Sequence, residues 1–405
     1  MFRLSALLVS CALLLCACID KHEIQGQNQA STVNPSFLSA KGTKADPAYV
    51  IALPQDHLPH PDFDIEWWYL TANLEDEQQQ EYALQWTLFR FTNAQQQDSW
   101  HIGQTFMAHA SLHTPNAHFF EEKFAPGGLG NAFVALHQQA DEASTKLAVN
   151  TNTELGDFFT MQIDNWRWQG VNPDATMFPA KLSASIRPNR QANAGADEYS
   201  SINSSVNIEM RLTPAGPFIM HGENGYSVKS KEGKHASHYY SLPFIDIEGS
   251  IELLDATVET AQKRTIKVKG KAWYDHEWTS TLLDASTEGW DWMSLHLHNG
   301  DKLMAFSMRL NDDDNYQTGT YIRANGESVT LLPSDIKLTI KGYEDTSHGR
   351  FPLNWQVEVP SQGLSLEVNA VTFNAYNQAR FPYYEGPVNV SGSHSGSGFL
   401  ELTGY

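Results

Sequence analysis

Two carboxylates stand among aromatic rings in the segment Trp273–Trp278, which reads Trp-Tyr-Asp-His-Glu-Trp. Successive side chains of a β-strand point to opposite faces, so one face of this segment carries Trp273, Asp275 and Glu277. Burial among indole rings removes water from a carboxylate and raises its pKa, which makes it a candidate general acid. The alternative is structural: the two acids pair with an arginine such as Arg309 or cap a turn.

Two other segments combine acids, histidines and aromatic rings. In His238–Ser241 a histidine precedes two tyrosines and a serine, which indicates either a proton relay or a buried hydrogen-bonded cluster. In Asp64–Tyr69 an acid, Glu66, begins a very aromatic strand. Glu66 is either a ligand-binding group or a carboxylate that accepts backbone N–H bonds where the strand begins.

Patterns for metals and cofactors are weak. His296 and His298 are two residues apart with no third ligand suggested by the spacing, and His109 and His113 also lack a clear third ligand. The sequence has no phosphate-binding loop, no dinucleotide fingerprint and no Gly-x-Ser-x-Gly elbow. We therefore expect neither a metal nor a cofactor.

The composition excludes some partners. The 405 residues include 27 Lys and Arg against 47 Asp and Glu, a formal net charge of −20. Nucleic acids need a basic surface that replaces their counterions, so we expect no nucleic-acid partner. The chain also has 11 Trp, 15 Tyr and 20 Phe, which favours an aromatic-lined interior for an apolar ligand.

Short runs of alternating polar and apolar residues predict an all-β protein. They begin with Tyr82–Phe91, end with Leu364–Val371, and are separated by turn signals such as Asn299-Gly300. Helical periodicity is almost absent beyond Tyr49. The stretch 189–206, rich in Asn, Ser, Ala and Gly, is predicted to be a long surface loop.

A weak internal repeat predicts two barrels in tandem. The two copies are Trp67–Arg90 and Trp290–Arg309. Each copy begins with a Trp-x-aromatic motif, and a leucine follows five residues after the second aromatic residue of that motif. A turn and an apolar strand that ends in arginine complete the copy. We expect the arginine to stack on the indole ring of an inward-facing tryptophan in each copy. The alternative is chance similarity between two hairpins. Duplication predicts one barrel over residues 48–240 and a second over 241–405.

The N-terminus predicts export and a lipid anchor. One arginine is followed by an apolar stretch that ends in Leu15–Cys18, a pattern that resembles a bacterial lipobox with Cys18 as the lipidated residue. Residues 1–17 would then be the signal peptide and 18–47 a flexible tether. An ordinary signal peptide is the alternative. Because Ile19, not Asp, follows the anchor, we predict the periplasmic face of the outer membrane.

Motifs in order over residues 50–405 resemble the AttH / carotenoid hydratase family. They are Asp64–Tyr69 with Gln85 and Phe89-Arg90, His221-Gly222, His238–Ser241, Trp273–Trp278, Gly289–Trp292, Tyr384–Val388 and Glu401–Tyr405. The resemblance implies two lipocalin-like antiparallel barrels. In the hydratase branch, a histidine and an aspartate that match His238 and Asp275 add water to an acyclic carotenoid. Where that branch has tyrosine this chain has Trp273, which favours the AttH branch, linked to ABC transport systems.

Two functions follow as expectations. The first is a membrane-anchored lipoprotein that binds or carries an elongated apolar ligand, with an ABC transporter as partner. The second is a hydratase of an acyclic isoprenoid. We predict three catalytic residues for the hydratase, which are Asp275, His238 and Glu277. The predicted ligand-binding residues are Glu66, Trp67, Tyr69, Tyr240, Trp273, Trp290 and Trp292.

Overall fold

The computed structural model describes residues 42–97, 102–136, 158–172, 176–187, 205–255, 262–281, 286–311 and 315–405. In these ranges the regular elements are strands and two short 3₁₀ turns, η2 (Gln55–His57) and η4 (Pro360–Gln362). The prediction of an all-β protein is confirmed. No helix among the described residues is long and apolar enough to cross a membrane.

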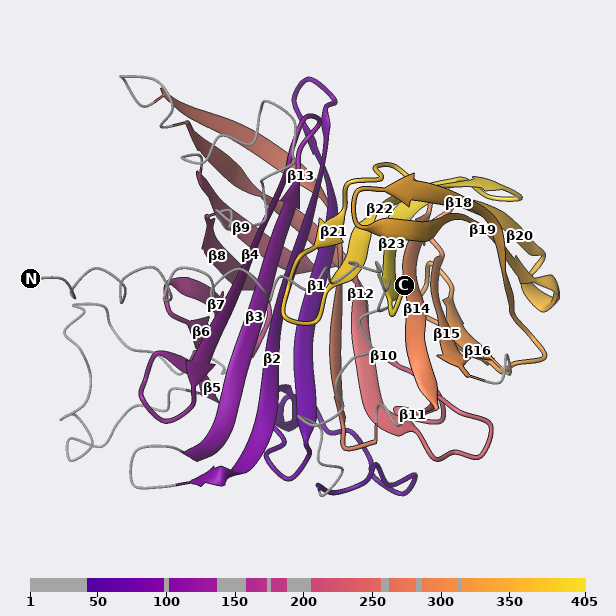
Figure 1. The fold of residues 1–405 in the computed structure, drawn as a ribbon, viewed down its shortest axis with the longest axis horizontal. Helices are drawn as coiled ribbons and strands as arrows, with labels where there is room; N and C mark the ends of the chain where they lie inside the picture. The colour runs from indigo at the N-terminus through magenta and orange to yellow at the C-terminus, as the bar shows by residue number, and fades with distance from the viewer. Residues whose placement is uncertain are drawn as a thin grey trace, which may run out of the picture. The chain divides into compact units, whose positions relative to one another are not determined.

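The first sheet contains thirteen antiparallel strands (Figure 1). They are β1 (Ile65–Asp76), β2 (Glu81–Gln97), β3 (Ile102–His113), β4 (His118–Pro126), β5 (Ala132–Leu136), β6 (Phe159–Ile163), β7 (Trp166–Gly170), β8 (Ala180–Ile186), β9 (Ser205–Pro214), β10 (Ile219–Met220), β11 (Tyr226–Val228), β12 (Ala236–Asp255) and β13 (Gln262–Thr279). The order from β4 to β5 runs through β1, β13 and β12. Lys123 in β4 donates to Asn165 at 2.5 Å, which brings the edge strand β4 to the β6–β7 turn.

The second sheet contains ten strands around its own apolar core. They are β14 (Thr287–Leu297), β15 (Lys302–Leu310), β16 (Tyr316–Ile322), β17 (Ser328–Leu331), β18 (Lys337–Thr346), β19 (Gly349–Val359), β20 (Leu364–Ala370), β21 (Tyr376–Asn377), β22 (Tyr383–Gly392) and β23 (Gly396–Thr403). The Gln317 side chain bonds both the N–H and the carbonyl of Leu338 at 2.9 Å, so β16 meets the edge strand β18. Each sheet thus curls around a core, as a lipocalin-like barrel does.

A third apolar cluster joins the two sheets. It combines side chains of β1, β12 and β13 with side chains of β14, β15 and β23, among them Tyr69, Trp273, Trp292 and Phe306. Strand alternation explains this arrangement. Every second residue of β1 and β13 faces the core of the first barrel, and over Trp67–Tyr69 and Trp273–Glu277 the residues between them face the second sheet. The functional residues lie on these two faces.

The boundary between the sheets lies later in the chain than the repeat indicated. Residues 241–279, assigned to the second barrel on sequence, form most of β12 and β13, which pair with each other and with β1 in the first sheet. The chain reaches the second sheet at Thr287. Pairing of β13 with β1 joins residues about 200 positions apart, and a local repeat carries no information on such a contact.

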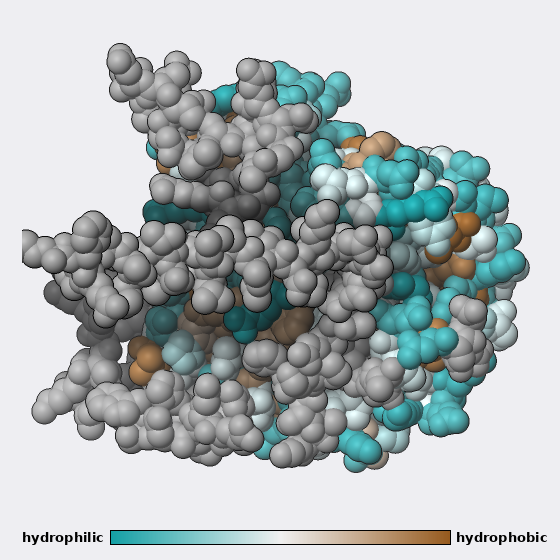
Figure 2. All heavy atoms as spheres, in the orientation of Figure 1, coloured by the Kyte–Doolittle hydropathy of each residue, from teal (hydrophilic) through white to brown (hydrophobic). Residues whose placement is uncertain are grey.

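Both hairpins of the repeat exist, as β1–β2 and β14–β15. Their arginines behave differently from the expectation. Arg90 is fully buried and binds Glu66, and Arg309 lies 3.7 Å over the ring of Tyr405. The predicted signal peptide, Cys18 and nearly all of the 189–206 loop lie outside the described residues. The coloured part of the surface in Figure 2 is mostly hydrophilic, with a few small hydrophobic patches.

The close approach of β13 to β1 gives a first prediction. A Cβ at Gly270 would lie 2.0 Å from the carbonyl oxygen of Asn73. Gly270→Val should therefore cost about 1–3 kcal/mol of folding stability, because the strands must separate. Lys269→Val, at a side chain that is 74% exposed, is the matched control. Equal denaturation midpoints for the two variants would contradict this contact.

Candidate functional site

The residues predicted from the sequence divide between the two faces of the first sheet. Those on the face toward the second sheet are Trp67, Tyr69, Trp273, Asp275 and Glu277, with Trp290 and Trp292 opposite them on β14. Those on the barrel side are Glu66, His238 and Tyr240. The alternation expected for Trp273–Trp278 is therefore present, but it separates His238 from Asp275.

Asp275 is a buried carboxyl surrounded by hydrogen-bond donors. It is 3% exposed and accepts bonds from Trp273 Nε1 at 2.6 Å, from Tyr239 Oη at 2.9 Å and from Ser241 Oγ. No cation lies within ion-pair distance among the described residues. Burial raises its pKa to about 7, against the lowering effect of the three hydrogen bonds. At neutral pH the group therefore exists in both protonated and ionised forms.

A hydrogen-bonded path leads away from Asp275 to the second sheet. Ser241 Oγ lies 2.5 Å from His221 Nε2, and His221 Nδ1 lies 2.8 Å from Thr320 Oγ1 in β16. Burial lowers the pKa of His221 well below its usual value, so the ring is neutral. Its stacking on Tyr239, with ring centroids 4.0 Å apart, fixes its position. This path can move a proton to or from Asp275.

Glu277, two residues further along β13, is ionically paired. Lys229 Nζ lies 2.9 Å from Glu277 and Ser237 Oγ donates to it at 2.5 Å. Arg309, the partner proposed for the acids on sequence, instead lies 3.4 Å from Asp291. Glu277 is therefore held by a lysine, and Asp275 is the acid without a counter-ion.

The second sheet adds two buried acids to the same space. Glu385 accepts a hydrogen bond from Tyr69, and its pKa is raised well above the usual value by burial and by Glu401. Glu401 accepts from Trp290 Nε1 at 2.5 Å, and burial raises its pKa to about 7. The space between the sheets is therefore poorly solvated and holds several carboxyls that protonate readily.

Aromatic rings enclose this region. Tyr69 meets Trp292 edge-on at 5.3 Å, and Trp273 meets Trp292 edge-on at 6.5 Å. Trp292 Nε1 also donates to Tyr239 Oη at 3.4 Å. The negative faces of such rings can stabilise a positive charge that develops between them.

A large cavity between the sheets approaches Asp275 without including it. Its volume is about 2500 Å³, and its lining includes Ala83, Phe244, Lys271, His296 and Lys302. The ring of Trp273 contacts that of His296 at 5.9 Å. Trp273 also donates to Asp275. The side chain of Trp273 therefore lies between the acid and His296, which is part of the cavity wall.

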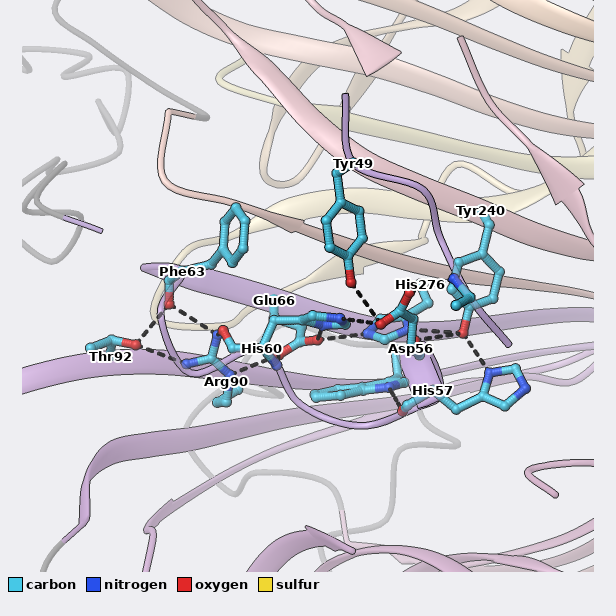
Figure 3. A network of polar contacts seen from close by, with 12 residues as sticks. Tyr49, Asp56, His57, His60, Phe63, Glu66, Arg90, Thr92, Tyr240 and His276 are labelled. Atoms are coloured by element: carbon cyan, nitrogen blue, oxygen red, sulfur yellow. Dashed lines mark hydrogen bonds and ion pairs between the residues drawn. The ribbon is translucent and has the colours of Figure 1, made fainter. Parts of the chain in front are cut away.

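The barrel side carries a different network, centred on Glu66 (Figure 3). Glu66 is fully buried and accepts four bonds, from His60 N at 2.8 Å, His60 Nδ1 at 2.6 Å, Arg90 Nε at 2.8 Å and His276 Nε2 at 2.8 Å. Burial alone would raise its pKa, but these bonds and the charge of Arg90 outweigh burial and lower the pKa. The structural alternative for Glu66, acceptance of a backbone N–H at the start of a strand, is part of this arrangement.

The network continues from His276 along the barrel. His276 Nδ1 lies 2.9 Å from Tyr240 Oη, which lies 2.6 Å from His57 Nδ1. Asp56 joins from the other side, 3.3 Å from His60 Nε2. Each donor and acceptor named in this paragraph has a hydrogen-bond partner, as is typical of a buried polar network that rigidifies a fold.

This network also contains the arrangement of ligand atoms among the described residues that best fits a metal. One ligand atom each from His60, Glu66 and His276 lies within 4.8 Å of the others. However, the ring nitrogens already bond the carboxylate at 2.6 and 2.8 Å, and the second oxygen binds Arg90. A cation would have to replace these bonds beside a guanidinium, so the residues do not fit a metal site.

His238 lies on the same side as this network, apart from it. Its ring lies 4.7 Å from Tyr49 and 5.5 Å from Trp278, and its Nε2 accepts from the N–H of Asp46 at 3.3 Å. The groups outside β13 that contact Asp275 are Tyr239 and Ser241, and His221 reaches it through Ser241. Sequence motifs contained all three, but only strand register could assign them to Asp275.

The sequence model of the AttH-like family matches residues 44–405. The chain belongs to the AttH-like family. Among solved structures it is similar to an AttH protein of Nitrosomonas europaea, with 26% identity, a TM-score of 0.70, and coverage of 90% of this chain and 99% of that one. It shares its fold with kievitone hydratase of Nectria haematococca, at 16% identity, a TM-score of 0.56, and coverage of 90% and 95%.

One curated relative also matches this AttH-like chain. It is the dehydratase asqC of Emericella nidulans, 24% identical over 240 residues, which are 54% of this chain and 65% of the relative. The match thus spans less than two thirds of that dehydratase. The family and the lipocalin-like fold agree with the resemblance seen in the sequence.

The Glu66 network gives a second prediction. Arg90→Met should destabilise the protein by about 3–5 kcal/mol, because it leaves a buried carboxylate without its cation. Adding Glu66→Gln should recover part of this loss. The penalty of Arg90→Met should also shrink below about pH 4.3, where glutamate protonates in the unfolded chain.

Chemical denaturation across pH measures these differences. The control is Arg323→Met, which removes an exposed ion pair with Glu327 and should change stability by less than about 1 kcal/mol. If the double variant is as unstable as Arg90→Met at every pH, charge compensation is not the role of Arg90.

Proposed function

We propose that this AttH-like protein binds an apolar, unsaturated ligand between its two sheets and adds water to a C=C bond, or removes water to form one. The observation that supports this proposal is Asp275, a carboxyl whose pKa burial raises to about 7 inside an aromatic enclosure. A general acid works best when its pKa lies near the working pH.

The reaction needs one proton and one water molecule. Asp275 transfers its carboxyl proton to one alkene carbon, and the other carbon becomes a carbocation. Water forms a C–O bond with that carbon and then loses a proton. The proton returns to the Asp275 carboxylate, directly or through Ser241 and His221. The products are an alcohol and the original acid, and elimination of water follows the same steps in reverse.

The surrounding residues suit such a path. The rings of Trp273 and Trp292 can each stabilise the carbocation by about 0.5–2 kcal/mol. The cavity supplies the ligand and water, and a shift of the Trp273 side chain would admit the alkene to Asp275. The low solvent exposure of the site protects the carbocation from uncontrolled reaction.

The names of related proteins support the same reaction class. Kievitone hydratase and dehydratase asqC are named for the addition and the removal of water, and the former shares the fold of this chain. Their substrates are not transferred to this protein.

The third prediction tests Asp275 directly. Asp275→Asn should keep ligand binding and lose turnover by at least about a hundredfold, as expected when a general acid is removed. The matched control is His238→Gln, because His238 lies on the opposite face of the sheet and should not affect turnover. The assay incubates acyclic isoprenoids and unsaturated fatty acids in ¹⁸O-labelled water and measures label in the products.

Two outcomes would contradict the proposal. One is equal label incorporation by Asp275→Asn and the parent protein. The other is a larger loss for His238→Gln than for Asp275→Asn. A parent protein that binds these ligands but incorporates no label would leave binding as the function.

Binding and transport form a second candidate function, which the size of the cavity favours. Its volume of about 2500 Å³ exceeds the range of roughly 300–1,000 Å³ usual for small-molecule pockets. For this second function, the protein would be anchored by lipid in the periplasm, where it carries an elongated apolar ligand and acts with an ABC transporter. Solvent extraction of the purified protein followed by mass spectrometry identifies such a ligand.

The lipid anchor gives the fourth prediction. Cys18→Ala should move the protein from the outer-membrane fraction to the soluble periplasmic fraction, since acyl chains are needed to hold it at the membrane. The comparison is Cys16→Ala, which should stay in the membrane because Leu15 does not suit the position before a lipidated cysteine. Membrane retention of Cys18→Ala would contradict the anchor.

A further inference from the structure

Lys302 is a buried cation at the wall of the inter-sheet cavity. It begins β15, is 8% exposed, and lines the cavity together with Phe244, His296 and Lys271. Its Nζ donates to the carbonyl of Gly300 at 2.7 Å and lies 5.0 Å over the ring of Phe244. Among the described residues no carboxylate lies within ion-pair distance of it. A buried ammonium with this environment is costly unless an anion joins it.

His296 stands directly beside this lysine. The two residues are cross-strand partners in β14 and β15, so their side chains leave the sheet on the same face. Nδ1 of His296 is buried and has no hydrogen-bond partner. Burial, Lys302 and Lys271 lower the pKa of His296 to about 3, so the ring is neutral and can donate one N–H.

The other charges near Lys302 are already paired. Lys271 lies 2.5 Å from Asp246, and Lys269 lies 3.7 Å from Glu75. Asp301 accepts bonds from Ala324 N and Asn299. Burial and Lys271 lower the pKa of Lys302 to about 8, so it remains mostly charged at neutral pH. The N–H groups in this part of the cavity that can still donate to a bound anion therefore belong to Lys302 and His296.

We infer that Lys302 and His296 bind the anionic head group of an amphiphilic ligand whose apolar chain extends toward Asp275. Lys271 and Asp275 are four residues apart on one face of β13, a separation of about 13 Å along the strand. Trp273 and Met304 of the third apolar cluster lie between the head-group site and Asp275 and would give the chain apolar surroundings once Trp273 shifts. The ligand is thus an anionic amphiphile with its unsaturation away from the head group.

The position of the reacting C=C bond in the ligand rests on the proposed function. Binding of the head group does not, since it requires no turnover. A lone anion in water would gain little here. An amphiphile gains both the charge-assisted bonds at the cavity wall and the burial of its chain. Carboxylate and phosphate head groups share this chemistry.

Calorimetric binding of oleate, oleyl phosphate and oleyl alcohol below their micellar concentrations tests the inference with the full-length protein. Oleate or oleyl phosphate should bind more tightly than oleyl alcohol. Lys302→Met should weaken binding of the anionic ligand by about tenfold to a hundredfold, the value of a charge-assisted hydrogen bond. It should leave oleyl alcohol unchanged, and Lys302→Arg should retain the preference. The control is Lys263→Met, at an exposed lysine paired with Glu252.

A second measurement does not depend on affinity. Without ligand, Lys302→Met should melt at a temperature equal to or above that of the parent, and oleate should raise the melting temperature of the parent much more than that of the variant. Equal affinities for oleate and oleyl alcohol, or equal losses for both in Lys302→Met, would overturn the inference. Asp275→Asn should keep the anion preference. If the parent protein shows this preference but no turnover, only the proposed reaction is overturned and head-group binding stands.

Discussion

The carboxyl of Asp275 is buried, accepts hydrogen bonds from three side chains and has no cation within ion-pair distance among the described residues. Burial without a counter-ion is costly for a carboxylate, and three donors recover only part of that cost. The surrounding structure must therefore hold Trp273, Tyr239 and Ser241 in place against this cost. They lie on β12 and β13, the two longest strands of the first sheet.

The two faces of these strands each carry a buried acid, and the pKa values of these two acids are shifted in opposite directions. On the barrel side, Glu66 is surrounded by Arg90, His60 and His276, and its pKa is lowered. On the inter-sheet side, Asp275 is surrounded by neutral donors, and its pKa is raised. Fully paired networks of the first kind rigidify a fold, and acids of the second kind are typical of functional sites. The first network fixes the strands that position the second group.

The sequence predicted the faces of individual strands correctly, because side-chain alternation is a local property. It placed Asp275 with Glu277 and apart from His276. It could not supply the partners of Asp275, which depend on the register between β12 and β13. In that register Ser241 lies opposite Asp275 and His238 lies opposite Trp278. Since His238 and Ser241 are three residues apart, they point to opposite faces, so the expected pair of His238 and Asp275 does not form.

The division into two barrels was also predicted, but the predicted boundary after residue 240 lies too early, because β12 and β13 belong to the first sheet. Local hairpins such as β14–β15 are visible as a repeat, whereas the pairing of β13 with β1 closes a loop of nearly 200 residues. For the same reason, the lysine that pairs with Glu277 was missed, since Lys229 reaches it from a segment that has no motif of its own.

The titration of Asp275 itself tests most directly whether this carboxyl is a general acid at neutral pH. Infrared difference spectra between the parent protein and Asp275→Asn, recorded across pH with ¹³C-labelled aspartate, report the protonation of this carboxyl. The signal of the protonated acid should persist to about pH 7, because burial raises the pKa of Asp275. A transition near the ordinary aspartate value of about 3.9 would contradict it.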